Sequence, residues 1–362
     1  FVLDAVVGSN VAEVVDPPHR ARGIVAAGLL GVALVVGVAL YLVVSSPAAT
    51  ASLETCNGRI ELCTRRLDEV AFPTTHNSMT AADDGFLLSN QEVGIERQLR
   101  DGVRGFQIDA YLGSVRTNGG LQVVFTDLTD DKLATIADAT TPELAEQALQ
   151  FRAIVGPPPE TARQRVYLCH NFCELGAVPM RDEMVTIRRY LDRHPNEVVV
   201  IVLQDELDAA ELEPVLRQSG IDRYLAAVDP DRPMPTLASL IASGRRVVLG
   251  LENGRLGRRV VNVFADGLVQ EVPYNYRTVD ELVAADACRP LRGRPDAPLF
   301  QFNHWVTPAS RAAARVANAE ELLGARLDRC ALERGRFPNL VAVDFYRTGG
   351  LFRVVEELNA TP

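Results

Sequence analysis

The sequence predicts an α/β protein: a distorted (β/α) TIM-type barrel preceded by one N-terminal transmembrane helix. Short apolar, often β-branched runs alternate with helix-like stretches through most of the chain. The run Val198–Leu203 is apolar at every position, which is typical of a parallel strand buried on both faces. A doubly wound sheet is the alternative, but no G-x-G-x-x-G follows the first run, and one barrel fits the 362 residues.

The N-terminal region contains a candidate membrane anchor. The 21 residues from Ile24 to Val44 carry no charge, and a helix of that length spans a bilayer core of roughly 30 Å. Arg20 and Arg22 precede it, so the positive-inside rule places the following residues outside the cytoplasm. The apolar run is longer than the core of most cleaved signal peptides, which favours an uncleaved anchor and leaves secretion after cleavage, or a buried core helix, as alternatives. The expected organisation is a cytoplasmic segment 1–23, a transmembrane helix 24–44, a linker 45–55 and a barrel 56–360.

The composition is that of a folded, acidic protein. Apolar residues make up 47% of the chain, charged residues 23%, and the net charge is −10. A nucleic-acid partner is not expected, because such proteins carry a basic surface. Charge alone would not hold this protein on anionic lipid either.

The cysteines indicate an oxidising compartment. There are six, an even number, and all follow the apolar segment. Many pairings are possible, and proximity favours Cys56–Cys63, Cys169–Cys173 and Cys288–Cys330. The spacings C-x6-C and C-x3-C do not match the usual zinc-binding patterns.

The elements of the predicted barrel follow in order along the chain. Expected strands are 70–72, 105–112, 121–125, 166–168, 198–204, 246–251, 299–302 and 340–343. Helices are expected over Gln91–Asp101, which ends at Gly102, and over Arg181–Arg193, which ends before Pro195. Thr278, with Glu281 three residues later, predicts the start of a further helix.

Polar residues stand where the apolar runs end. In a β/α barrel the carboxyl ends of the strands converge on the active-site face, so these side chains should meet in one cleft. Paired histidines there suit proton transfer to and from a reacting group, and a carboxylate behind one ring would orient it. The residues concerned are His76, Asn77, Gln107, Asp109, His170, Asp205, Glu252, Asn303, Trp305 and Asp344.

Five stretches resemble the phosphatidylinositol-specific phospholipase C family, X-domain type. They are Thr75–Ser78, Arg104–Asp109, Cys169–Cys173, Val200–Asp205 and Val343–Tyr346, and the resemblance extends over about residues 56–360. It identifies the chain as a bacterial, membrane-anchored member. The fold of this family is a distorted β/α barrel. Its members cleave inositol phospholipids through attack of the inositol 2-hydroxyl on phosphorus. The resemblance implies that His76 is the general base, His170 the general acid, and Asp344 the carboxylate that supports the base.

The resemblance also implies a metal site. Asn77, Gln107, Asp109 and Asp205 match positions that hold Ca²⁺ in the metal-dependent branch. The metal-independent bacterial branch has arginine and lysine at the positions of Asp109 and Asp205, so the acids here favour the metal-dependent type. Gln107 replaces the usual glutamate and lowers the charge of the site, and Asp205 is shorter than the usual glutamate.

Arg104, Glu252, Asn303 and Trp305 are expected to contact the substrate, with no basic cluster for additional phosphates. The expected partner is a membrane phospholipid. Two alternatives stay open: a glycerophosphodiester- or sphingolipid-type phosphodiesterase, and a non-catalytic barrel that binds a sugar or a partner. The oligomeric state is not predicted.

Overall fold

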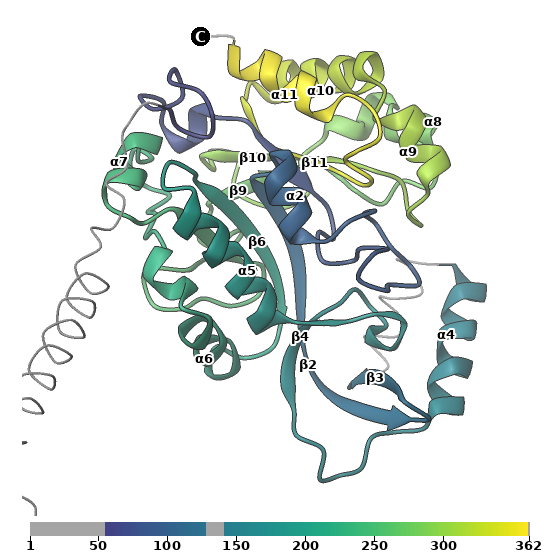
Figure 1. Ribbon diagram of the computed structural model, residues 1–362. Coiled ribbons are helices and arrows are strands. Elements are labelled where there is room, and N and C mark those ends of the chain that lie inside the picture. The colour runs from purple at the N-terminus through teal and green to yellow at the C-terminus, as the bar shows by residue number, and fades with distance from the viewer. Residues whose placement is uncertain (1–54, 128–140, 361–362) are drawn as a thin grey trace, which may run out of the picture. The chain divides into compact units, whose positions relative to one another are not determined.

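The computed structural model of the protein describes residues 55–127 and 141–360 (Figure 1). The chain divides into two units, Phe1–Thr50 and Ala51–Pro362, and all described residues belong to the second. The predicted segment 1–23, the predicted helix 24–44 and nearly all of the linker 45–55 lie outside the described residues. Within the described part of the chain, no helix is long and apolar enough to cross a membrane.

Eight parallel strands form the barrel, arranged around it in chain order. The two ends of the hydrogen-bonded path, β8 and β9, are not paired with each other in the described sheet, so the barrel is open there. The predicted parallel α/β class is confirmed, with strands that do not close into a complete barrel. The strands are β1 (Phe72–Thr75), β2 (Gly105–Asn118), β6 (Val199–Glu206), β7 (Val247–Leu251), β8 (Val261–Asn262), β9 (Val269–Glu271), β10 (Leu299–His304) and β11 (Pro338–Val343).

Helices cover part of the outside of the barrel. Helix α5 (Met180–Arg193) buries Met184, Ile187 and Leu191 at helical spacing, as its sequence predicts. Between β7 and β9 the described chain forms no helix. The other α-helices are α2 (Ile95–Asp101), α4 (Pro142–Val155), α6 (Ala209–Ser219), α7 (Leu237–Ala242), α8 (Val279–Leu282), α9 (Arg311–Ala317), α10 (Glu320–Arg334) and α11 (Leu351–Ala360).

Alternation along the strands separates two apolar layers. In β6, Ile201 and Leu203 belong to a cluster packed with helix residues, whereas Val200 and Val202 belong to a second cluster with residues of other strands. Successive side chains of a strand point to opposite faces. The second cluster therefore includes the interior of the barrel, together with residues of α7 and of the segment before β1.

Strand β2 continues beyond the barrel. Its outer half pairs antiparallel with β3 (Leu121–Thr126) and β4 (Arg165–Leu168), and β4 pairs with β5 (Val178–Pro179). The predicted strands 121–125 and 166–168 therefore exist but do not belong to the parallel barrel. Gly119 and Gly120, both with positive φ, form the tight turn between β2 and β3, and antiparallel pairing follows from that turn.

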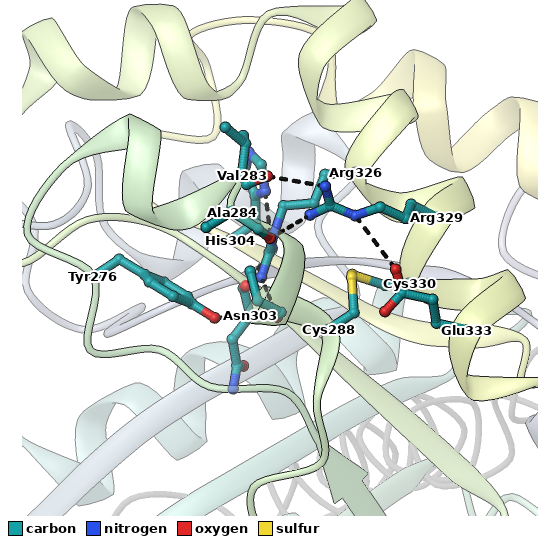
Figure 2. Close-up of a disulfide and its surroundings, with 11 residues drawn as sticks. Tyr276, Val283, Ala284, Cys288, Asn303, His304, Arg326, Arg329, Cys330 and Glu333 are labelled. Atoms are coloured by element: carbon teal, nitrogen blue, oxygen red, sulfur yellow. Dashed lines mark hydrogen bonds and ion pairs between the residues drawn. A yellow bond between two sulfur atoms is a disulfide. The ribbon is translucent and has the colours of Figure 1, made fainter.

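All three predicted disulfides are present: Cys56–Cys63, Cys169–Cys173 and Cys288–Cys330. The third joins the short helix Ala285–Cys288 to α10, beside Arg326 and Arg329 (Figure 2). The Thr278 side chain accepts a hydrogen bond from the Glu281 backbone at the start of α8, which confirms the predicted cap.

Candidate active site

The polar strand ends meet in one cavity at the carboxyl end of the barrel, as the sequence predicts. In β6 the alternation brings Val202 and Gln204 to this cavity, and in β2 it brings Gln107 and Asp109. The polar and aromatic residues that line the cavity are His76, Asn77, Gln107, Asp109, His170, Gln204, Glu252, Glu271, Tyr274, Asn275, Arg292, Gln301, Asn303, Trp305 and Thr307.

His76 follows β1 and is held by its neighbours in the barrel. Its Nδ1 lies 2.9 Å from Oδ1 of Asp344, the residue that follows β11. The Asn90 amide donates to both oxygens of Asp344, at 3.0 and 3.1 Å. Trp305 stacks on the imidazole with ring centroids 3.7 Å apart. The buried carboxylate fixes the ring orientation and would stabilise a positive charge on it.

His170 has a similar partner but a different origin. It follows β4, outside the barrel, and its Nδ1 lies 2.5 Å from Oδ2 of Asp109. The rings of His76 and His170 lie with their centroids 6.3 Å apart. Because each Nδ1 is bonded to a carboxylate, each ring offers its Nε2 atom to the shared cavity.

Both histidines are followed by an asparagine in the left-handed region. Asn77 has φ of 43° and Asn171 has φ of 59°. Asparagine is one of the few residues that adopt this conformation at low cost. The chain therefore turns sharply just after each histidine, and each ring stands at the end of its strand.

Five residues joined by hydrogen bonds and ion pairs line one side of the cavity, which we call the polar floor: Gln107, Glu252, Glu271, Arg292 and Asn303. Arg292 contacts both carboxylates, with 2.8 Å from its Nη1 to Glu252 Oε2. Glu271 accepts from Asn303 at 2.9 Å, and Asn303 accepts from Gln107 Nε2 at 3.3 Å. Because the Gln107 amide nitrogen donates to Asn303, its side-chain carbonyl oxygen faces away from that bond. This oxygen is buried without a partner in the described structure, so it can accept a hydrogen bond.

The floor carries unusual electrostatics. Burial raises the pKa of Glu252 to about 7, although Arg292 opposes this rise. Burial opposes the charge on Arg292, but the attraction of Glu252 and Glu271 outweighs it and raises the pKa of Arg292. Arg292 therefore stays a fixed cation, whereas Glu252 can exchange a proton near neutral pH.

The apolar side of the cavity lies beyond the two histidines. His76, Asn77, His170 and Thr307 line both the polar part and this second hollow. Apolar side chains from three loops and from α4 complete it: Phe86, Leu88, Leu144, Phe172, Leu175 and Pro308. The histidine pair thus stands between a polar and an apolar compartment.

Residues 150–359 match the family described as PI-PLC X 1, which is more than half of the chain. This chain belongs to the PI-PLC X family. Its relatives include "PI-PLC X domain-containing protein 1" of Arthroderma benhamiae, 25% identical over 325 residues that cover 84% of this chain and 89% of the relative. A PI-PLC X domain-containing protein of Arabidopsis thaliana is 22% identical over 319 residues, covering 79% of this chain and 60% of that protein.

A third relative of this PI-PLC X member is an "Uncharacterized secreted protein" of Arthroderma benhamiae, 22% identical, with 84% of this chain and 64% of the relative covered. Among solved structures, a double mutant of the phosphatidylinositol-specific phospholipase C from S. aureus is 14% identical, with a TM-score of 0.43, over 78% of this chain and 87% of that one. The three relatives matched by sequence are fungal and plant proteins, so the bacterial origin of this chain stays a prediction.

Two sequence-predicted site residues of this PI-PLC X protein lie elsewhere. Asp205 does not line the cavity; its Oδ1 accepts from the Asn253 backbone at 2.8 Å, and it lines a separate hollow. Alternation in β6 is the reason, because Gln204 occupies the inward position. Arg104 precedes β2 at the opposite end of the barrel, where its side chain bonds to Glu197 at 2.6 Å and to the hydroxyl of Tyr190.

The predicted Ca²⁺ ligand set does not fit the site. Asp205 is absent from the cavity, Gln107 is neutral, and Asp109 is bonded to His170. Ca²⁺ in proteins takes about 6–8 oxygen ligands, several of them usually carboxylates. In the described part of the chain, no group of three or more histidine, cysteine or acidic side chains could hold a metal ion.

Sequence reasoning missed several residues of the PI-PLC X site. Asn90 lies in a loop with no distinctive sequence pattern. Glu271 ends the three-residue strand β9, which is too short to recognise from the sequence, and the backbone of Arg292 accepts a hydrogen bond from Glu271. Gln204 was one position away from the predicted Asp205. His304, another histidine at a strand end, points away from the cavity: it is fully buried beside Arg326, and burial lowers its pKa to about 3.

Proposed function

We propose that this protein is a phosphodiesterase that cleaves an inositol phospholipid, with His76 accepting a proton from the attacking hydroxyl and His170 donating a proton to the leaving oxygen. One observation carries the proposal: two imidazoles in one cavity, each bonded at Nδ1 to a buried carboxylate, in a member of the PI-PLC X family. Such a pair can take a proton from one oxygen and give a proton to another.

The reaction begins with His76 neutral and His170 protonated. Nε2 of His76 accepts the proton of a substrate hydroxyl next to the phosphate, and the oxygen forms a bond to phosphorus. The bond from phosphorus to the leaving oxygen breaks, and His170 gives its proton to that oxygen. The products are a cyclic phosphate and a free alcohol, with His76 protonated and His170 neutral. A water molecule opens the cyclic phosphate with the two roles reversed.

The polar floor suits a polyol headgroup. Glu252, Glu271 and Arg292 offer charged hydrogen-bond partners for hydroxyl groups, and the Gln107 carbonyl oxygen accepts one more bond. Trp305 and Tyr274 add aromatic surface against which a sugar-like ring can pack. Glu252 and Glu271 both form ion pairs with Arg292, so little positive charge is left to bind additional phosphates. This favours phosphatidylinositol over its polyphosphorylated forms as the substrate.

The apolar hollow suits the lipid side of the substrate. It begins at the two histidines, where the leaving oxygen would lie, and Phe86, Leu88 and Phe172 line it. Leu88, which lines the hollow, is 43% exposed, and the preceding Leu87 is 71% exposed. We propose that the enzyme works outside the cytoplasm, which three disulfides favour, with residues 24–44 as its membrane anchor.

Turnover of phosphatidylinositol, followed by phosphorus NMR, tests the proposal. We expect a cyclic inositol phosphate, and equal rates with Ca²⁺ and with a chelator, because the Ca²⁺ ligand set is incomplete. His76→Ala serves as the inactive control. Turnover that requires Ca²⁺ would show that the enzyme depends on the metal. A protein that turns over no phosphatidylinositol would refute the proposed substrate.

A further inference from the structure

A disulfide encloses the residue proposed as the general acid. Cys169 directly precedes His170, Cys173 follows three residues after it, and the bond between them closes a five-residue loop. Both cysteines are buried, with exposed fractions of 0% and 1%. Neither of the other two disulfides includes or adjoins a residue that lines the catalytic cavity.

The loop Cys169–Cys173 has no barrel strand of its own to hold it. His170 follows the antiparallel strand β4, and its side chain is 31% exposed, compared with 18% for His76. Phe172 packs against Ala148 of α4, and the Cys169 backbone donates to Asp109 at 3.3 Å. Glu174, which directly follows Cys173, forms an ion pair with Arg152 of α4, and the disulfide adds a covalent restraint on the turn at Asn171.

We propose that the Cys169–Cys173 disulfide is a positioning element for proton donation by His170. The proposal rests on the proposed function and adds what keeps the acid within reach of the leaving oxygen. A displacement of about 1 Å can cost about 100-fold in rate even when the group remains present. A short disulfide loop limits that freedom at His170, whose backbone lies outside the parallel barrel.

The proposed role of His170 as a general acid can be tested by comparing substrates with different leaving groups. A phosphodiester with an alkyl leaving group needs a proton on the departing oxygen, whereas a nitrophenyl ester with the same inositol headgroup does not. In Cys169→Ser/Cys173→Ser we expect kcat for the alkyl ester to fall about 100-fold, KM to stay within about twofold, and kcat for the nitrophenyl ester to fall less than about threefold. His170→Ala should show the same pattern with a larger loss.

The Cys56–Cys63 bond provides a matched control. It also joins two buried cysteines across a short loop, with a sequence separation of 7 compared with 4, and it lies near Val198, which precedes β6 at the other end of the barrel. Loops of similar length are expected to contribute similar stability. Cys56→Ser/Cys63→Ser should therefore lower Tm by a similar amount and leave the ratio of the two rates unchanged.

Proton NMR of the imidazole Nδ1–H groups provides a second readout. In the Cys169–Cys173 variant, the resonance of His170 bonded to Asp109 should broaden or disappear, whereas that of His76 bonded to Asp344 should remain. A general loss of structure would remove both. If the serine variant does not fold, Cys169→Ala/Cys173→Val refills the volume of the bond and must show the same dependence on the leaving group.

The outcomes separate the two proposals. If His170→Ala discriminates between the esters and the folded disulfide variant does not, the positioning role is wrong and the proposed function stands. Equal losses on both esters in the disulfide variant would also overturn the positioning role. If His170→Ala itself does not discriminate, His170 is not the acid, and the proposed mechanism fails first.

Discussion

The two histidines of the cavity reach a similar arrangement by different means. His76 follows a strand paired on both sides in the parallel barrel, and its carboxylate, Asp344, follows a neighbouring strand. His170 follows β4, which pairs antiparallel with an extension of β2, and its carboxylate comes from β2 inside the barrel. One histidine is part of the barrel, and the other is added to it.

The difference shows what each type of support requires. Parallel register places His76 beside Asp344 without a local restraint, because β1 and β11 are paired through Thr75 and Val343, and the His76 backbone donates to Val343. His170 is placed beside Asp109 by the antiparallel register of β4 with β2, and a disulfide around His170 closes the turn that follows. One catalytic group is therefore positioned by parallel strand register, whereas the other combines antiparallel register with a covalent bond.

The largest expected effect comes from removing either ring. His76→Ala and His170→Ala should each lower kcat by about 10²–10⁴-fold, the usual contribution of a positioned acid or base. Only the His170 variant should regain activity on a substrate with a good leaving group. Steady-state kinetics on the two esters measures this, and equal behaviour of the two variants would remove the functional distinction between the histidines.

Replacing the carboxylates is expected to have the next largest effect. Asp344→Asn and Asp109→Asn keep the shape of each side chain but remove the charge that holds the imidazole, and about a 10²-fold loss in kcat is expected for each. Thermal unfolding serves as the control, since Tm should change little. A change below threefold in either variant would show that its histidine is held by something else.

Trp305 stabilises only one of the two rings. It stacks on His76 and makes no ring contact with His170 in the described structure. Stacking of an imidazolium on an indole contributes about 1 kcal/mol, so Trp305→Leu should lower kcat about fivefold on both esters alike. Unequal losses on the two esters would place Trp305 at the leaving group instead.

Glu252 belongs to the polar floor, and its main effect should be on stability. Its pKa lies above the ordinary value of 4.5, at about 7, so the folded protein holds this proton more tightly than the unfolded chain. That contribution is fully present below pH 4.5 and is lost as the pH rises to 7, up to about 3 kcal/mol in the free energy of unfolding. Glu252→Gln should flatten this part of the pH profile, measured by urea unfolding; an unchanged profile would contradict the raised pKa.

Local patterns in the sequence identified much of the site. Apolar runs mark where strands end, and His76, Asp109, Glu252 and Asn303 all reach the predicted cleft. The disulfides were also predictable, because each pairs cysteines that are adjacent in the list of six along the chain. Short-range features of this kind do not depend on how the strands pack.

Only the tertiary structure decided which face of each strand is functional. The run before Asp205 is apolar on both faces, so no alternation in the sequence distinguishes the inward Gln204 from its neighbour. The Asp109–His170 bond, the Asn90–Asp344 bond and the Arg292 ion pairs join residues from 21 to 254 positions apart. Residue types and strand ends are local properties of the sequence, whereas these contacts depend on strand register, which exists only once the barrel has formed.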